Sequence, residues 1–221
     1  MASMISHEGL IVPPRVLPPT IPEINPEITV WMPPYLAALV IGVFFGWLIA
    51  LALREKLSGS LNPFIITLPG IAAVLLSLRF GFGTELIQGS ILCLLLLFAS
   101  MSDIHTREVP DYIPIMIIIT ALIGTKLTEL PLMLLAAVVI TLPQLAVAIL
   151  KTGSYGGADI KLMAACAFML GFEKGLFAIC VGLSLAVICT MIIRKRQKKS
   201  VNESFALIPY LAIGSMAAFF I

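Results

Sequence analysis

Charged residues are scarce in this sequence, and their scarcity argues against a soluble fold. Asp, Glu, Lys and Arg make up 12% of the 221 residues, whereas 60% are hydrophobic. A soluble domain carries about a quarter charged residues and about half apolar ones. The net charge of +2 is too small, and too little interleaved with aromatics, to indicate a nucleic-acid partner. The composition therefore predicts an integral membrane protein that binds no nucleic acid.

Cysteine is equally scarce. The four cysteines lie singly inside apolar runs, so no CxxC pair is present and neither a zinc site nor a redox motif is indicated. We therefore expect no metal and no cofactor. The first residues also lack the basic and apolar regions of a cleaved signal peptide. Eight prolines between residues 13 and 34 instead predict an extended, irregular tail over residues 1–33, ahead of a membrane domain over residues 34–221.

Apolar runs bounded by charged residues, glycine or proline predict an all-α integral membrane bundle of about eight transmembrane helices. The sixth run is short, because 14 residues rise only about 21 Å. The eight runs cover roughly residues 35–53, 63–79, 84–102, 111–126, 130–150, 159–172, 175–193 and 204–221.

The distribution of basic residues predicts how these runs are oriented across the membrane. With eight crossings and the N-terminus outside, ten basic residues face the cytosol and four face outward. If the sixth run did not cross, the cluster RKRQKK at 194–199 would face outward, against the positive-inside tendency. We therefore predict a cytoplasmic-membrane protein with both termini outside.

Two aspartates stand out because they fall at the ends of apolar runs. Asp103 closes the third run in LLLLFASMSDIHTREVPDYI, and Asp159 opens the sixth in KTGSYGGADIKLMAA. The predicted topology puts both at the cytosolic ends of their helices. An ionisable group there is costly, so a functional role is the default hypothesis. Either aspartate alone could be a helix cap, but together they indicate catalysis.

Two neighbouring carboxylates suit amide hydrolysis. They cannot both ionise cheaply when close together, so one keeps a proton at neutral pH. The charged carboxylate can then deprotonate a water molecule, while the protonated one hydrogen-bonds the scissile carbonyl. Gly153, Gly156 and Gly157 precede Asp159 and leave room for a substrate strand to approach the backbone. The pattern predicts an aspartic protease whose carboxylates share a water-filled cavity bounded by the third, fourth and sixth spans.

The two motifs resemble those of the type IV prepilin peptidases, which are polytopic aspartic proteases. In DIHTREVPD (103–111) the first aspartate is followed by a proline at the family's spacing, and Asp111 stands where asparagine is usual. In GGADIKL (156–162) alanine replaces the second glycine of GxGD. The resemblance covers roughly residues 36–221 and implies that Asp103 and Asp159 are catalytic. It implies a motif or substrate-approach role for Gly156, Gly157, Ala158, Lys161, Pro110 and Asp111.

The resemblance also implies a substrate, and it implies that one activity of the longer family members is missing. Family members remove the short basic leader of a prepilin or pseudopilin on the cytosolic face, usually after a glycine. Long members insert a domain with two CxxC pairs, associated with N-methylation, after the first span. Here that position is the loop Arg54–Asn62, which holds no cysteine. The chain therefore resembles a compact peptidase that does not methylate, with membrane lipid as its other partner.

Three other hypotheses stay open. A presenilin-like intramembrane protease shares the GxGD element, but it pairs that element with a YD motif, whereas Ser102 precedes Asp103 here. A small proton-coupled transporter would use the two aspartates as a relay, and a scaffold protein would use them as caps. His105 is a weaker candidate for proton relay, and Arg107, Lys151 and Lys161 are candidates for steadying the cytosolic face.

Overall fold

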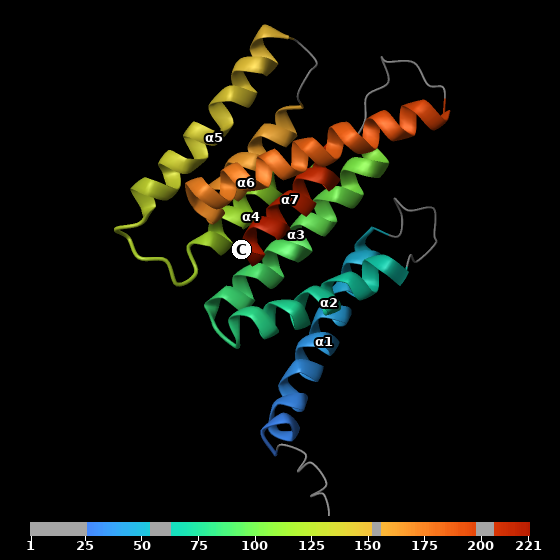
Figure 1. Cartoon of the computed structure of the whole chain (residues 1–221), viewed down its shortest axis with the longest axis vertical. Coiled ribbons are helices and arrows are strands. Elements are labelled where there is room, and N and C mark those ends of the chain that lie inside the picture. The colour runs from blue at the N-terminus through green and yellow to red at the C-terminus, as the bar shows by residue number, and fades with distance from the viewer. Residues whose placement is uncertain (1–25, 54–62, 152–155, 198–205) are drawn as a thin grey trace, which may run out of the picture. The chain divides into compact units, whose positions relative to one another are not determined.

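The computed structural model describes residues 26–53, 63–151, 156–197 and 206–221. Over these residues the chain is all-helical and forms no strand, in agreement with the predicted class. Contacts group the chain into two units, Met1–Pro33 and Pro34–Ile221, and the packed bundle belongs to the second. The helices (Figure 1) are α1 (Pro26–Ala52), α2 (Pro63–Phe80), α3 (Thr84–Thr106), α4 (Tyr112–Ala121), α5 (Leu130–Leu150), α6 (Gly157–Gln197) and α7 (Ile208–Phe220).

The first helix begins earlier than the sequence predicts. Residues 26–33 belong to α1, although the prolines predict irregular chain up to residue 33. That part of the prediction is wrong. Pro26 is the first residue of the helix, where its missing N–H leaves no intrahelical hydrogen bond unmade. Residues 1–25 and the loop 54–62 lie outside the described residues, so the predictions for them stay predictions.

The sixth and seventh predicted runs both fall within α6. A kink at Gly171 divides this helix into two segments. This glycine has φ 78° and ψ −177°, a conformation open almost only to glycine, so the helix is interrupted there. Five of the described helices are long and apolar enough to cross a membrane. Helices α4 and α7 are apolar but have only 10 and 13 residues. Eight crossings therefore remain a prediction.

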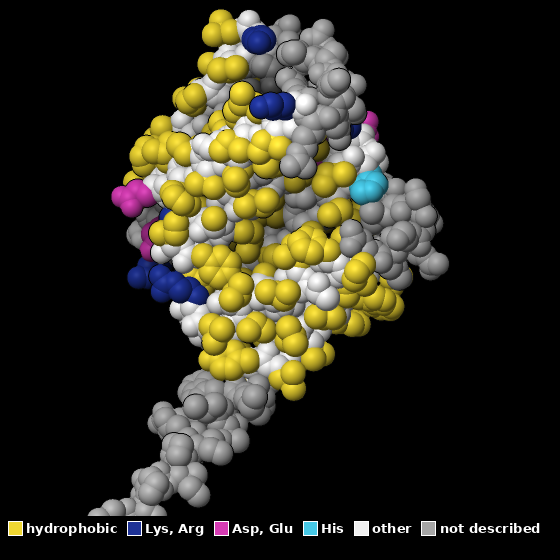
Figure 2. Space-filling model, turned by 45° about the vertical axis from the view of Figure 1, so that its right-hand side comes forward, with side chains coloured by type: hydrophobic (Ala, Val, Ile, Leu, Met, Phe, Trp, Pro, Cys, Tyr) yellow, Lys and Arg dark blue, Asp and Glu magenta, His cyan; other side chains and the backbone are white. Residues whose placement is uncertain are grey.

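A central apolar cluster joins five of the helices. Helix α7 lies between α3 and α6 and packs on both, while α5 packs on α6 and α2 on α3 (Figure 1). On the face shown in Figure 2, hydrophobic side chains cover most of the described surface, as expected for helices that face lipid. The buried members of the cluster are Leu76, Leu92, Leu96, Ala99, Ile113, Ile117, Leu162, Ala165, Cys166, Ile208, Ala212 and Phe219.

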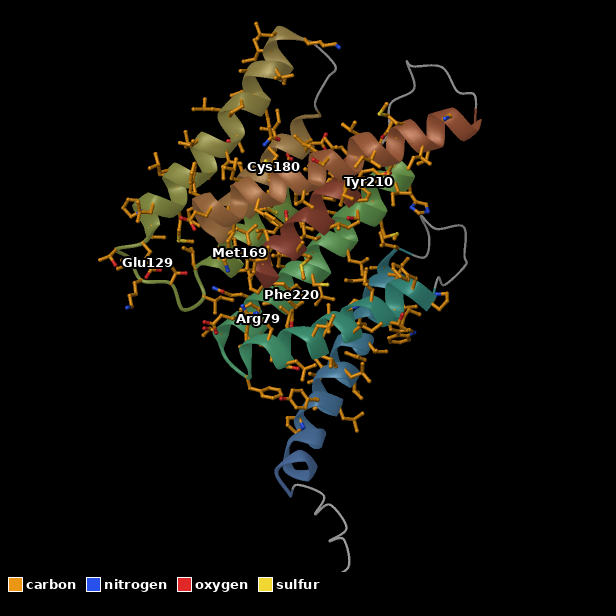
Figure 3. All side chains as sticks on the ribbon, in the orientation of Figure 1. Arg79, Glu129, Met169, Cys180, Tyr210 and Phe220 are labelled. Atoms are coloured by element: carbon orange, nitrogen blue, oxygen red, sulfur yellow. The ribbon has the colours of Figure 1, made fainter. Side chains whose placement is uncertain are left out.

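Hydrogen bonds fix which helix ends lie together. The Gln88 Nε2 in α3 donates to the Ile123 carbonyl oxygen, just beyond α4, at 2.6 Å. The Arg79 Nε at the end of α2 donates to the Phe220 carbonyl oxygen at the end of α7 at 3.3 Å (Figure 3). Helix α4 therefore runs antiparallel to α3. The opposite ends of α3, α4 and α7 meet where the predicted aspartate Asp103 lies.

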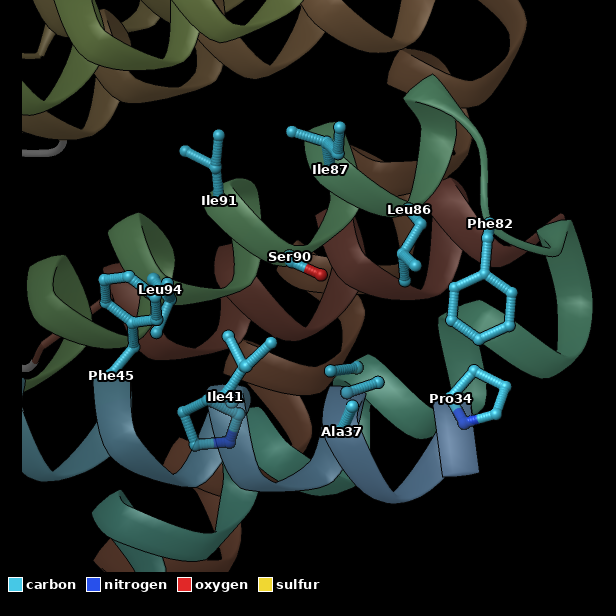
Figure 4. A pocket seen from close by; sticks show the side chains of 14 residues that line it. Pro34, Ala37, Ile41, Phe45, Phe82, Leu86, Ile87, Ser90, Ile91 and Leu94 are labelled. Atoms are coloured by element: carbon cyan, nitrogen blue, oxygen red, sulfur yellow. The ribbon is translucent and has the colours of Figure 1, made fainter. Parts of the chain in front are cut away.

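A hollow of about 540 Å³ lies between α1, α2 and α3 (Figure 4). Its walls are apolar except for Ser90, with Ile41 and Phe45 of α1 facing Ile87 and Leu94 of α3. None of the predicted site residues lines it. The predicted site residues lie instead at the helix ends.

Candidate active site

Asp103 lies in the last turn of α3 and is buried, with 8% of its surface exposed. The helix ends at Thr106, because Arg107 takes a left-handed conformation (φ 57°) and its N–H donates to the Asp103 carbonyl oxygen at 3.1 Å. Two hydroxyls close the turn that follows. The Ser102 Oγ donates to the Glu108 carbonyl oxygen at 2.7 Å, and the Thr106 Oγ1 donates to the Ser102 carbonyl oxygen at 2.8 Å, with the Glu108 carbonyl oxygen 3.2 Å away. The aspartate therefore stands on a turn held by its own neighbours.

The start of α7 supplies a donor to this carboxylate. The Ile208 N–H donates to the Asp103 Oδ2 at 3.2 Å. Ile208 is the first residue of α7, so its N–H has no partner within the helix. The positive end of the helix dipole favours a nearby anion, and Arg107 adds a favourable Coulomb interaction. Burial of Asp103 disfavours its charged form, and these groups offset part of that cost.

Asp159 lies in the first turn of α6 and is half-buried. Its Oδ2 turns back and accepts the Gly156 N–H at 3.1 Å, as in half of a capping box. A Cβ on Gly156 would lie 3.0 Å from that oxygen, so glycine gives the carboxylate its room. Gly157 faces open space, and Ala158 packs against the central cluster. Gly153 lies outside the described residues.

The structure brings the two predicted aspartates to one end of the bundle. They are close enough for Asp103 to act on Asp159 by Coulomb repulsion. The prediction named the third, fourth and sixth spans as the surrounding elements. Helix α7 contributes as well, because its first N–H binds Asp103. Two carboxylates with different donors, near each other at a helix-end junction, can divide the roles of acid and base.

The other motif residues gather at the same end. The Lys161 Nζ lies 2.8 Å from the Asp111 Oδ1, and both side chains are exposed. The Pro110 carbonyl oxygen accepts the Ile113 N–H at 3.1 Å, which helps to start α4. An ion pair therefore connects the first motif to the second, although they stand 50 residues apart (161 − 111).

The weaker candidates are less central. The His105 Nδ1 lies 2.9 Å from the Met101 carbonyl oxygen of its own helix, and its side chain is exposed. Lys151 caps the end of α5 and is also exposed. Within the described ranges, no three His, Cys, Asp or Glu side chains stand close enough together to hold a metal ion. Asp103 and Asp159 are therefore the central candidates for acid–base chemistry.

A comparison with known protein families matches the segment that holds both aspartates. The model of the type IV leader peptidase family matches residues 90–192. The matched segment covers a little under half of the chain and is similar to this family. The match confirms the resemblance found from the two motifs, and the segment contains both aspartates and the Asp111–Lys161 pair. Comparisons with curated proteins and with solved structures give no match.

The leader peptidase match ends before α7, and sequence reasoning also missed what α7 supplies. The donor to Asp103 is a backbone N–H of Ile208, and a backbone group has no signature in the side-chain pattern. Pro209 was the available signal, because proline is common in the first turn of a helix and so marks where unpaired N–H groups stand. Ser102 was missed too, although it directly precedes Asp103 and closes the turn after it.

Proposed function

We propose that this chain is a membrane aspartic endopeptidase that removes the short basic leader of type IV prepilins or pseudopilin-like proteins. The observation that carries the proposal is the meeting of Asp103 and Asp159 at one end of the bundle. The match to the leader peptidase family over residues 90–192 supports proteolysis. The paired carboxylates support the aspartic form of that chemistry.

The reaction needs one charged and one protonated carboxylate. Burial of Asp159, with repulsion from Asp103 as a smaller contribution, favours a state in which the pair keeps one proton. The charged partner removes a proton from water, and the resulting nucleophile attacks the scissile carbonyl. The protonated partner hydrogen-bonds the carbonyl oxygen and later supplies a proton to the departing amine. The Ile208 N–H, beside Asp103, supports a negative charge at that position.

The cytosolic side is supported by basic residues at the same end as the aspartates. Arg107 follows Asp103, Lys151 ends the helix before the Gly156 motif, and Lys161 follows Asp159. Cytosolic loops are enriched in such residues. A cytosolic site places the cut before the apolar helix of the substrate, and it leaves both termini of this chain outside.

The test is cleavage by the purified full chain in liposomes. The probe is a prepilin with a basic leader, a glycine and a long apolar helix. We expect a shortened product, and we expect Asp103→Asn and Asp159→Asn each to lower kcat by about 10²- to 10⁴-fold, the range for loss of an acid–base group. Topology and expression should not change.

Two outcomes would contradict the proposal. Substantial turnover by either aspartate variant would remove that residue from the catalytic pair. Cuts inside the apolar helix of the probe, with the leader left in place, would favour the presenilin-like alternative.

A further inference from the structure

The exposed ends of the two motifs are joined by an ion pair. The Lys161 Nζ and the Asp111 Oδ1 lie 2.8 Å apart. Asp111 stands eight residues after Asp103, and Lys161 stands two residues after Asp159. The pair therefore connects the segment that follows one aspartate to the helix that carries the other.

The Asp111 side chain makes this contact and does not cap α4. Asp111 is the N-cap residue of α4, a position where aspartate commonly accepts a hydrogen bond from the first turn. Its side chain makes no capping hydrogen bond. The carboxylate instead reaches across to α6. A contact between motifs thus replaces a contact that would serve α4 alone.

The Asp111–Lys161 ion pair lies at the exposed end of the apolar interface between α4 and α6. Two residues after Asp111, Ile113 is fully buried, and so is Leu162, directly after Lys161. Both belong to the central cluster that also holds Ala99 of α3. Apolar contacts decide which faces of α4 and α6 meet. A directional contact at the end of the interface can fix how the two chain ends are aligned.

We propose that Asp111 and Lys161 are positioning residues that hold the segment after Asp103 in register with the start of α6. This inference rests on the proposed function. The Lys161 and Asp111 side chains are 57% and 73% exposed, so the pair adds little to overall stability. Its effect falls on catalysis, because small displacements of catalytic groups lower the rate of the chemical step. We therefore expect changes in kcat rather than in KM.

The test is a double-mutant cycle in the liposome cleavage assay. Lys161→Met and Asp111→Leu should each lower kcat by about two- to fivefold, the factor that corresponds to an exposed ion pair. The double variant should be no slower than the slower single one. Lys161→Arg keeps the charge and the donors, and Asp111→Asn keeps an acceptor oxygen, so both should retain most activity. Lys126→Met, a matched loss of an exposed lysine at the other end of α4, should leave kcat unchanged.

Two results would overturn the inference. If Lys161 acted directly on the catalytic charges, Lys161→Met would lower kcat further in the Asp111→Leu background and would shift the pH profile. The second measurement, amide hydrogen exchange over residues 107–113, needs no cleavage. Exchange should be faster in Lys161→Met and Asp111→Leu than in the wild type and Lys126→Met, and unchanged exchange would refute the positioning role. A wild type that cut no probe would refute the proposed function, and the exchange measurement would still decide the role of the pair.

Discussion

Replacing Gly214 by alanine tests whether α7 holds the candidate site together. Gly214 faces α6, where a new Cβ would meet the Ala178 carbonyl oxygen and lie 2.8 Å from the Gly182 nitrogen. These are backbone atoms, so no side-chain rotation can relieve the contact. The two helices must separate. Small residues at helix crossings in membranes allow backbones to approach in this way.

Two terms set the expected change in the free energy of unfolding, and a third sets the expected change in cleavage. Alanine has the better helix propensity by about 1 kcal/mol, but overpacking costs about 1–3 kcal/mol. The net effect on the free energy of unfolding is a loss of up to about 2 kcal/mol. Moving α7 also draws the Ile208 N–H away from the Asp103 Oδ2, and at 3.2 Å that hydrogen bond has little room to lengthen. A hydrogen bond to a charged group contributes about 1.5–3 kcal/mol, so cleavage should fall by about tenfold or more.

The assay measures thermal unfolding in detergent and kcat in liposomes. Gly83→Ala is the matched control, because its new Cβ would meet only the tip of the Glu85 side chain, which can swing away. Ile213→Ala, on an exposed face of α7, controls for changes to the same helix. If Gly214→Ala were as stable and as active as the wild type, the argument that α7 positions Asp103 would be refuted.

Three further predictions concern chemistry and sidedness. Incubating the purified chain with a prepilin and labelled S-adenosylmethionine should give a shortened product with a free N-terminal amine. The reason is that the nine residues Arg54–Asn62 cannot form a zinc domain. A methylated product would contradict this prediction. Chelators should leave cleavage unchanged, because two carboxylates and a water supply both acid and base; loss that zinc restored would show a metal requirement. In a background without native cysteines, Asp111→Cys should react with an impermeant maleimide only from the cytosolic side and Lys126→Cys only from the outside; labelling of both from one side would exclude the proposed topology.

Much of the fold follows from the apolar runs, because each run falls on a described helix. The boundaries follow less well. The fourth run ends five residues early, at Ala121 instead of 126, in a turn where Gly124 has φ 75°. Position within an apolar run gives no sign of this, since Leu122 and Ile123 are as apolar as the helix before them. Proline misled at the first helix, because the prediction treated Pro26 as an irregular residue and not as a helix start.

The sequence predicts which side chains form the candidate site, but it does not predict their long-range contacts or the backbone donor. Asp103 and Asp159 are visible because charges are rare in this sequence and these two end or begin apolar runs. The pairing of Asp111 with Lys161 was not visible, since it joins residues from separate helices. The Ile208 donor is a backbone group whose role depends on where α7 begins. Long-range contacts and backbone donors are properties of the folded chain.

Asp103 and Asp159 lie at the same end of the bundle only if the chain runs along the bundle an even number of times between them. Helices α4 and α5 lie between, and the 10 residues of α4 rise only about 15 Å, too short to span on length alone. Yet Gln88, near the start of α3, binds the Ile123 carbonyl oxygen beyond α4, and a Cβ on Gly124 would touch Thr84 at the first turn of α3. The chain therefore travels back along α3, and the turn residues after α4 complete the distance. Helix α5 then has 21 residues for the return, and Lys151 at its end stands close in sequence to Gly156. The placement of Asp159 at the same end of the bundle as Asp103 thus agrees with the hydrogen bond between α3 and the α4–α5 turn, which the length of α4 alone does not indicate.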